Sequence, residues 1–323
     1  MIQISSAMLE IPTFEDIQKA AEQIRPYAHR TPVFTSATLN ERFGARLFFK
    51  CENFQKVGAF KFRGACNAVF SLSEEEAQRG VATHSSGNHA AALALAARLR
   101  RIQAHIVMPE NSAKIKIAAV KGYGATITFC KPTLQARETV LAEVVEKTNA
   151  IFIHPYDDVR VIAGQGTAAL ELLQEIPDLG MIMAPVSGGG LMSGTSIAAR
   201  GVSPRIELIG VEPKTADDAY RSMQAGKLMP QASSHTIADG LRAMLSERTF
   251  TILRTHDCHI VTVSEAGIIE GMRLVWERMK IIIEPSAAVT IAALLEKKVS
   301  ISGKRVGVIL SGGNVDLDEL PWR

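Results

Sequence analysis

Hydrophobic positions along the chain alternate between two spacings. Short runs rich in β-branched and aromatic residues have the pattern of buried strands, and they lie at 45–52, 80–85, 104–110, 125–130, 150–155, 181–186, 206–212 and 306–313. Runs with apolar residues at helical spacing follow the first four of them, at 60–72, 88–100, 112–124 and 136–149. Such alternation predicts βαβ units and an α/β fold of parallel-rich open sheets that helices cover on both faces.

The order of these runs also predicts two domains. Four consecutive strand–helix units lie between about Gly80 and His154, and they favour a smaller lobe inserted into a larger sheet. The length of 323 residues agrees, at roughly 100–200 residues per domain. We therefore expect a large domain formed by residues 1–75 and 158–323 and a small inserted domain formed by residues 76–157.

Composition narrows the function classes. The chain has 47% hydrophobic residues and a net charge of +3, which is ordinary for a soluble protein and gives no clustered basic footprint for nucleic acid. Four widely separated cysteines without a CxxC pair favour reduced thiols in the cytoplasm. We expect no signal peptide and no membrane span, because no apolar run reaches roughly 20 residues. The longest candidate, 281–295, contains Glu284 and Pro285.

Three glycine-bearing loops follow predicted strands, where open parallel sheets bind ligands. They are THSSGNH (83–89), VSGGGLMSG (186–194) and LSGGNVDL (310–317). The second could hold a phosphate through backbone N–H groups before a helix, or be a tight turn that binds nothing. The first could bind a carboxylate, or simply cap the next helix. Neither a P-loop nor a dinucleotide GxGxxG pattern occurs.

A lysine in GAFKFRG (58–64) raises a further question. Lys61 stands between two phenylalanines, so its stem could snorkel along apolar surface, or burial could lower the pKa of its amine. Four features together indicate pyridoxal phosphate. They are a lysine of this kind, a possible phosphate-binding loop, a possible carboxylate-binding loop and Ser311 directly after a strand. The motifs HExxH and GxSxG are absent.

The sequence resembles the fold type II pyridoxal-phosphate enzymes, in particular the serine racemase and serine/threonine dehydratase group. The matching segments are FFKCENFQKVGAFKFRGACNAV, THSSGNHAAAL, HPYDDVRVIAGQGT, GGGLMSG, GVEPKTADDAYRS, TIADGL, VWERMKIIIEPSAAV and LSGGNVDL. They run in family order from about residue 10 to 318. The resemblance implies a two-domain fold like that of the tryptophan synthase β-subunit, an active site between the domains and a homodimer.

The resemblance also implies roles for individual residues. Lys61 would form the Schiff base, and Ser86 would lie on the opposite face of the cofactor. The residues implied to hold the cofactor are Phe60, Lys61, Asn88, Ser187, Gly188, Gly189, Gly190, Leu191 and Ser311. Those implied to bind substrate are Ser85, Ser86, Asn88, His89, Arg137, Asp239 and Gly240, although Arg137 also fits a solvated helix residue. Those implied to bind Mg²⁺, Mn²⁺ or Ca²⁺ are Glu212, the Ala216 carbonyl and Asp218, which could instead cap a helix.

The implied reaction is α,β-elimination. Lys61 removes the Cα proton, the β-hydroxyl leaves as water, and L-serine, L-threonine or a related amino acid becomes a 2-oxo acid and ammonia. If Ser86 delivers a proton to the other face, the outcome is serine racemisation. A substrate with a second carboxylate, such as 3-hydroxyaspartate, and a catalytically silent binding protein are further alternatives.

Three departures from the family pattern stand out. Ser187 replaces a glycine in the phosphate loop, where its hydroxyl could donate to phosphate. Ala91 replaces a glutamine. The chain ends soon after LSGGNVDL, so we expect no C-terminal regulatory domain.

Overall fold

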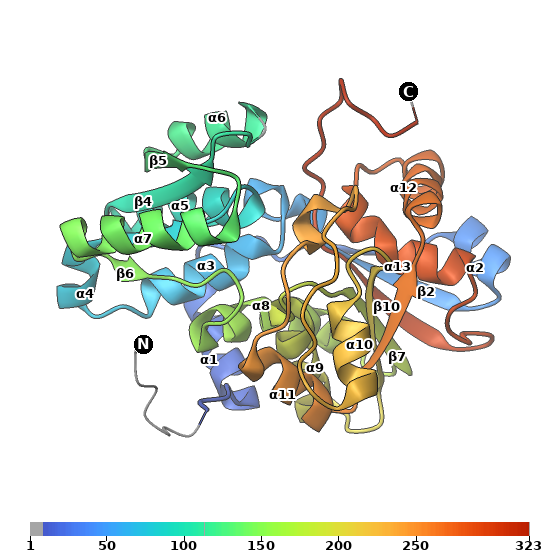
Figure 1. The fold of residues 1–323 in the computed structure, drawn as a ribbon. Helices are drawn as coiled ribbons and strands as arrows, with labels where there is room; N and C mark the ends of the chain where they lie inside the picture. Colours follow the sequence, from blue (N-terminus) through green and yellow to red (C-terminus); the bar gives the residue numbers. More distant parts are fainter. Residues whose placement is uncertain (1–8, 113, 323) are drawn as a thin grey trace.

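The computed structural model describes residues 9–112 and 114–322, and it contains two sheets (Figure 1). The six-stranded sheet has the order β1-β2-β10-β7-β8-β9, in which only the β1–β2 pair is antiparallel. The four-stranded sheet has the order β5-β4-β3-β6 and is parallel throughout. The predicted α/β fold of parallel-rich sheets covered by helices is therefore confirmed.

The strands are β1 (Val33–Phe34), β2 (Arg46–Cys51), β3 (Val81–His84), β4 (Ala104–Pro109), β5 (Thr126–Cys130), β6 (Ile151–Phe152), β7 (Met181–Pro185), β8 (Glu207–Pro213), β9 (His259–Val263) and β10 (Arg305–Leu310). The α-helices are α1 (Phe14–Ile24), α2 (Ala37–Phe43), α3 (Lys61–Phe70), α4 (Glu74–Arg79), α5 (Asn88–Arg100), α6 (Lys114–Gly122), α7 (Leu134–Thr148), α8 (Val159–Glu175), α9 (Gly190–Val202), α10 (Asp218–Ala225), α11 (Glu247–Thr255), α12 (Glu265–Met279) and α13 (Pro285–Leu295). Three short 3-10 helices complete the fold, η1 (Glu52–Phe54), η2 (Lys56–Gly58) and η3 (Asp239–Leu241).

Two predicted features differ in detail. The strand expected at 150–155 is reduced to the two residues of β6, although Ile153 still donates its N–H to the Ala82 carbonyl of β3 at 2.9 Å and accepts from Thr83 Oγ1 at 2.8 Å. Strands β1 and β9 are additions to the predicted set, and they close the two edges of the six-stranded sheet beside β2 and β8.

Helices bury both faces of each sheet. One face of the six-stranded sheet packs against α2, α12 and α13, and the other against α1, α8, α9 and α11. In the four-stranded sheet, α3, α5 and α6 cover one face and α7 covers the other. Near-continuous apolar strands such as β7 are explained by this double coverage, since both of their faces are buried.

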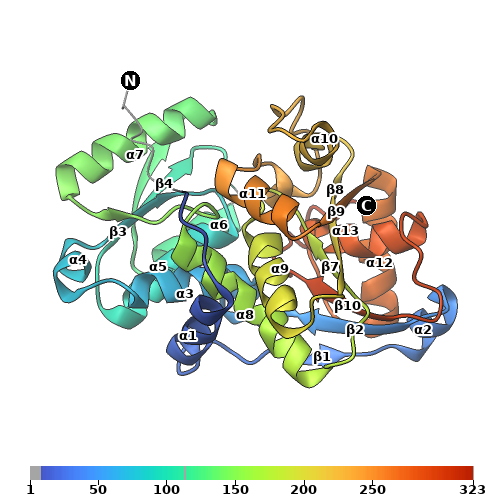
Figure 2. The same ribbon diagram turned by 90° about the horizontal axis from the view of Figure 1, so that it is seen from below.

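The two sheets lie on opposite sides of the molecule with α8 between them (Figures 1 and 2). Helices α8 and α9 touch backbone to backbone, because a Cβ atom on Gly194 would lie 2.5 Å from the N atom of Gly166. Strands of the four-stranded sheet come from 81–152, within the predicted inserted domain, whose boundaries stay a prediction. Among the described residues, no helix has the length and apolar character to cross a membrane.

Candidate active site

Lys61 lies where two distant segments of the chain meet. Ala59 and Gly312 form an isolated antiparallel bridge, and the Phe60 N–H donates to the Ser311 carbonyl at 3.0 Å. Helix α3 begins with Lys61, and Ser311 directly follows β10. This pairing therefore holds the lysine next to the carboxyl end of a central strand.

The amine of Lys61 points at the backbone rather than at water. Its Nζ donates to the Pro155 carbonyl at 2.8 Å and lies 5.2 Å from the centre of the Phe60 ring. Burial lowers the pKa of Lys61 to about 8, and the negative charge of Glu284 opposes this change. At neutral pH such an amine has a much larger neutral fraction than an ordinary lysine, and the neutral form is the one that attacks an aldehyde.

The loop that carries this carbonyl is fixed by a histidine. The Nδ1 atom of His154 accepts the N–H groups of Tyr156 at 3.3 Å and Asp157 at 2.9 Å. Burial lowers the pKa of His154 to about 4, so the ring is neutral and Nδ1 stays an acceptor. The Pro155 carbonyl is therefore presented to Lys61 by an ordered backbone.

The glycine-rich loop between β7 and α9 has no room for side chains. A Cβ atom on Gly188 would lie 2.4 Å from the Tyr156 ring, and one on Gly190 would lie 2.8 Å from Gln165 Oε1. Gly189 is the N-cap of α9 and has a φ of +85°. The first N–H groups of α9 have no partner within the helix, and the helix dipole favours an anion there. The loop thus fits a phosphate.

Two polar side chains beside this loop behave differently. Ser187 Oγ donates to the Ala243 carbonyl at 3.2 Å and accepts the Ala243 N–H at 3.0 Å, so its proton is already used. Both amide atoms of Gln165 are buried without a hydrogen-bond partner in the described structure. A bound phosphate next to Gly190 would give the Gln165 amide the partner that buried polar groups require.

The loop after β3 presents the N-terminus of α5. The Gly87 N–H donates to Ser85 Oγ at 3.3 Å, while the N–H groups of the first turn, from Asn88 onward, are free to bind a carboxylate. Ser86 is exposed, and its hydroxyl makes no hydrogen bond within the part of the chain that the structure describes. His89 is buried beneath the loop, where burial and the charge of nearby Lys61 lower its pKa.

A buried carboxylate that the sequence motifs did not single out lies next to this loop. Glu284 is 4% exposed and accepts Asn88 Nδ2 at 3.0 and 3.1 Å and the Asn314 N–H at 3.2 Å. The Asn314 side chain also donates to Asn88 Oδ1 at 3.0 Å, which fixes the orientation of the Asn88 amide. Burial and the charge of Asp239 raise the pKa of Glu284 to about 7. In the sequence, the signal that could have identified Glu284 is its place as an acidic residue within the long apolar run at 281–295.

The remaining predicted substrate residues lie around the same loop. Asp239 in η3 forms an ion pair with Lys116 of α6, whose Nζ would lie 3.6 Å from a Cβ atom on Gly87. The Gly240 N–H donates to Ser286 Oγ at 3.0 Å, on the first turn of α13. Lys116 therefore connects the small sheet with the large one directly in front of the α5 N-terminus.

Arg137 on α7 is a half-buried cation without an acidic partner. Its Nε is buried and makes no hydrogen bond, and no carboxylate of the described residues pairs with its guanidinium. Burial and the charge of Arg137 lower the pKa of His84, at the end of β3, to about 4. The guanidinium thus remains available to an acidic ligand.

The three residues predicted to bind a metal lie between the end of β8 and the start of α10. Glu212 accepts the Tyr220 N–H at 2.6 Å, and Asp218 accepts the Leu245 N–H at 3.0 Å. Burial raises the pKa of Glu212 to about 9, with a contribution from the charge of Asp218, and burial raises the pKa of Asp218 to about 6. Neither carboxylate forms an ion pair among the described residues, although the charge of Arg221 acts on Asp218, and the two carboxylates with the Ala216 carbonyl are the oxygen ligands that a hard divalent ion prefers. Among the described residues, no group of three or more His, Cys, Asp or Glu side chains is arranged for a metal.

Taken together, the structure places Lys61, Phe60, Ser311, Asn88 and the 187–191 loop at the carboxyl ends of strands from both sheets. Arg137 lies on α7, Glu212 near the end of β8 and Asp218 at the first position of α10. Their predicted roles, like those of the residues around Lys61, stay predictions.

Comparison with known proteins gives consistent results. The family model described as "Pyridoxal-phosphate dependent enzyme" matches residues 24–312. A beta-hydroxyaspartate dehydratase from Paracoccus denitrificans is 49% identical over 97% of this chain and 99% of its own length. An L-threo-3-hydroxyaspartate ammonia-lyase from Saccharomyces cerevisiae is 46% identical over 95% of this chain and 94% of its own. The crystal structure of serine racemase from Dictyostelium discoideum superposes with a TM-score of 0.90 at 49% identity, covering 95% of this chain and 99% of that one.

Proposed function

Because the chain belongs to the family of pyridoxal-phosphate dependent enzymes, we propose that it is a lyase that converts a β-hydroxy amino acid to a 2-oxo acid and ammonia. Among such substrates we favour one with a second carboxylate, of the 3-hydroxyaspartate type. The observation that carries this choice is Arg137, a half-buried guanidinium without an acidic partner among the described residues. Serine and threonine have no anionic side chain to pair with it.

The residues of the site fit the cofactor. The N–H groups at the start of α9 and the Gln165 amide would hold the phosphate, and Ser311 and Asn88 would contact the ring. When bound, pyridoxal phosphate supplies an aldehyde that joins to an amine and a ring that withdraws electrons from the neighbouring carbon. Ser311 is neutral, so it stabilises charge on the ring less than a carboxylate would, which favours elimination.

Lys61 acts as the base of the proposed reaction. Its amine, with a pKa of about 8, accepts the Cα proton of the substrate at Nζ, and the Pro155 carbonyl fixes where that nitrogen lies. The N-terminus of α5 holds the α-carboxylate, and Arg137 holds the second carboxylate. Asn88 cannot rotate away, because Glu284 and Asn314 occupy its amide atoms on one side.

A divalent cation belongs to the proposal as well. Glu212 and Asp218 are buried carboxylates with raised pKa values, and a bound Mg²⁺, Mn²⁺ or Ca²⁺ would keep both ionised. Leu245, which donates to Asp218, also packs against Gly189 of the phosphate loop. Loss of the ion would therefore affect the phosphate loop through Leu245.

Two further parts of the proposal concern the cellular compartment and the oligomeric state. All four cysteines are free and buried, which suits the cytoplasm. A homodimer is proposed on family resemblance alone.

The test uses purified protein incubated with L-serine, D-serine, L-threonine and threo-3-hydroxyaspartate, with and without Mg²⁺. Oxo acid and amino-acid enantiomers are measured together. We expect oxo acid from 3-hydroxyaspartate with the highest kcat/KM, and borohydride reduction followed by peptide mapping should leave a pyridoxyl group on Lys61. No oxo acid from any substrate, or an unmodified Lys61 in the reconstituted protein, would contradict the proposal.

Serine racemisation is the second candidate, and it is favoured by Ser86, which is exposed and whose hydroxyl has no partner among residues 9–112 and 114–322. The variant Ser86→Ala separates the two outcomes. Loss of D-serine formation with oxo-acid formation retained would support a second proton-transfer group on that face. Absence of D-serine with the unchanged protein would remove the candidate.

A further inference from the structure

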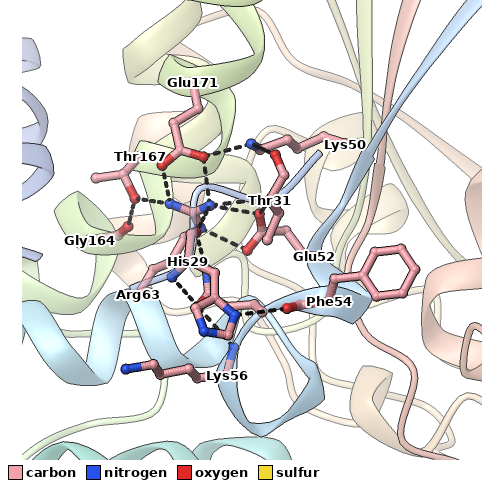
Figure 3. A network of polar contacts seen from close by, with 11 residues as sticks. His29, Thr31, Lys50, Glu52, Phe54, Lys56, Arg63, Gly164, Thr167 and Glu171 are labelled. Atoms are coloured by element: carbon pink, nitrogen blue, oxygen red, sulfur yellow. Dashed lines mark hydrogen bonds and ion pairs between the residues drawn. The ribbon is translucent and has the colours of Figure 1, made fainter. Parts of the chain in front are cut away.

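A cluster of four charged side chains, three of them fully buried, lies behind the helix that carries Lys61 (Figure 3). Arg63 lies at its centre with no exposed surface. Its Nε and Nη2 donate to Glu52 at 2.7 and 2.9 Å, and its Nη1 and Nη2 donate to Glu171 at 2.8 Å each. Lys50 Nζ donates to the same Glu171 carboxylate at 2.6 Å. Two basic and two acidic side chains thus pair with one another, and of these only the Glu171 side chain is partly exposed, at 17%.

The cluster joins three separate parts of the chain to α3. The groups that contact Arg63 or its carboxylates come from the segment before β1, the end of β2 and the middle of α8, namely His29 and Thr31, Lys50 and Glu52, and Thr167 and Glu171. Burial alone would raise the pKa of Glu171, but its hydrogen bond with Arg63 and the nearby positive charges lower it below the usual range. Glu171 is therefore ionised and paired with both Arg63 and Lys50.

Arg63 and Lys61 lie on opposite sides of the first turns of α3. Residues two apart in an α-helix are separated by about 200° around the axis. Lys61 accordingly reaches the Pro155 carbonyl, while Arg63 reaches the cluster. The same stretch of α3 touches α8 closely, because a Cβ atom on Gly164 would lie 2.6 Å from the Arg63 carbonyl. Any rotation or sliding of α3 that moves the amine must break this paired cluster.

We propose that Arg63 is a positioning residue for Lys61, which locks the first turn of α3 so that the amine stays beneath the Pro155 carbonyl. The guanidinium suits this task because its planar fork offers five donors and can serve two carboxylates and Thr167 at once. A lysine at the same position offers three donors from one atom and cannot span both carboxylates. The inference rests on the proposed role of Lys61 as the cofactor-binding amine.

The test compares Arg63→Lys with the control Arg200→Lys in the holoenzyme. Arg200, near the end of α9, is partly buried, and it donates to the backbone carbonyls of Pro204, Ile206 and His256 rather than to carboxylates. Both variants should lower the melting temperature. Only Arg63→Lys should shift the near-visible absorbance band of the bound cofactor and speed its removal by hydroxylamine about tenfold or more.

Thr167→Val provides a milder variant in case Arg63→Lys does not fold. It removes one hydrogen bond to the Arg63 guanidinium and should move the same two readouts in the same direction by a smaller factor. An unchanged band and an unchanged hydroxylamine rate in the folded variants, despite a lower melting temperature, would overturn the inference. Borohydride mapping of the unchanged protein separates this failure from failure of the proposed function, because an unmodified Lys61 there would refute its role whatever Arg63 does.

Discussion

The wild-type protein should lose folding stability as the pH rises, because the buried Glu284 carboxyl ionises. Replacing Glu284 with glutamine should abolish this loss. The buried carboxyl has a pKa of about 7, against an ordinary value of 4.5. Between pH 4.5 and about 7 the folded protein therefore keeps the Glu284 proton, whereas the unfolded chain releases it. The contribution to stability is therefore fully present below pH 4.5, falls between pH 4.5 and about 7, and is gone above that.

The size of the effect follows from the two values. A difference of about 2.5 in pKa, at about 1.36 kcal/mol for each unit, corresponds to about 3 kcal/mol of unfolding free energy. Glu284→Gln also changes the hydrogen bonds with Asn88 and the Asn314 N–H, but that cost does not depend on pH. The free-energy difference between variant and wild type should thus move in the variant's favour by about 3 kcal/mol across this window.

The measurement is urea unfolding of the cofactor-free protein at a series of pH values on both sides of the window. Wild type, Glu284→Gln and the control Glu247→Gln, at an exposed position on α11, are compared at each pH. Other groups titrate in the same range, and subtracting the wild-type curve removes them. A difference curve for Glu284→Gln that stays flat with pH would refute the reasoning, since the carboxyl would then titrate alike in both states.

Three further predictions concern the ligands. Arg137→Gln should lower kcat/KM for 3-hydroxyaspartate by about 10- to 100-fold, the value of a charged hydrogen bond, and leave L-serine turnover nearly unchanged, whereas equal losses on both substrates in oxo-acid assays would contradict the assigned contact. Gly188→Ala should weaken cofactor binding at least about tenfold in absorbance titrations, because its Cβ would lie 2.4 Å from the Tyr156 ring. Removal of divalent ions with a chelator should lower the melting temperature, and Glu212→Ala should abolish that dependence; a wild-type melting temperature that the chelator does not change would remove the metal proposal.

Much of the fold was predictable because its strands are buried on both faces. A run such as Met181–Pro185 is apolar throughout, and this pattern identifies a strand of a parallel sheet without knowledge of its neighbours. Strand β9, His259–Val263, was missed because its two polar residues, the exposed His259 and the partly buried Thr262, interrupt the apolar run at the sheet edge. The end of β6 at Phe152 depends on its pairing with β3, a contact between segments about 70 residues apart that no local spacing encodes.

The sequence could single out candidate residues where one segment carries the whole motif. Lys61 and the 187–191 loop are examples, since the relevant atoms lie close together in sequence, and their roles stay predictions. Glu284 was missed because its contacts in the site are with Asn88 and Asn314, which come from remote parts of the chain. The hydroxyl of Ser187 was expected to be able to serve a phosphate, yet it is satisfied by Ala243, a partner far along the chain.

The central position of β10 has a consequence for synthesis on the ribosome. This strand lies between β2 and β7, and Gly312 just beyond it pairs with Ala59. The N-terminal strands therefore cannot join the rest of their sheet until nearly the whole chain has left the exit tunnel. Until β10 is available, the edges of β2 and β7 that later pair with it stay unpaired. Chaperones that shield nascent chains would bind these apolar strands.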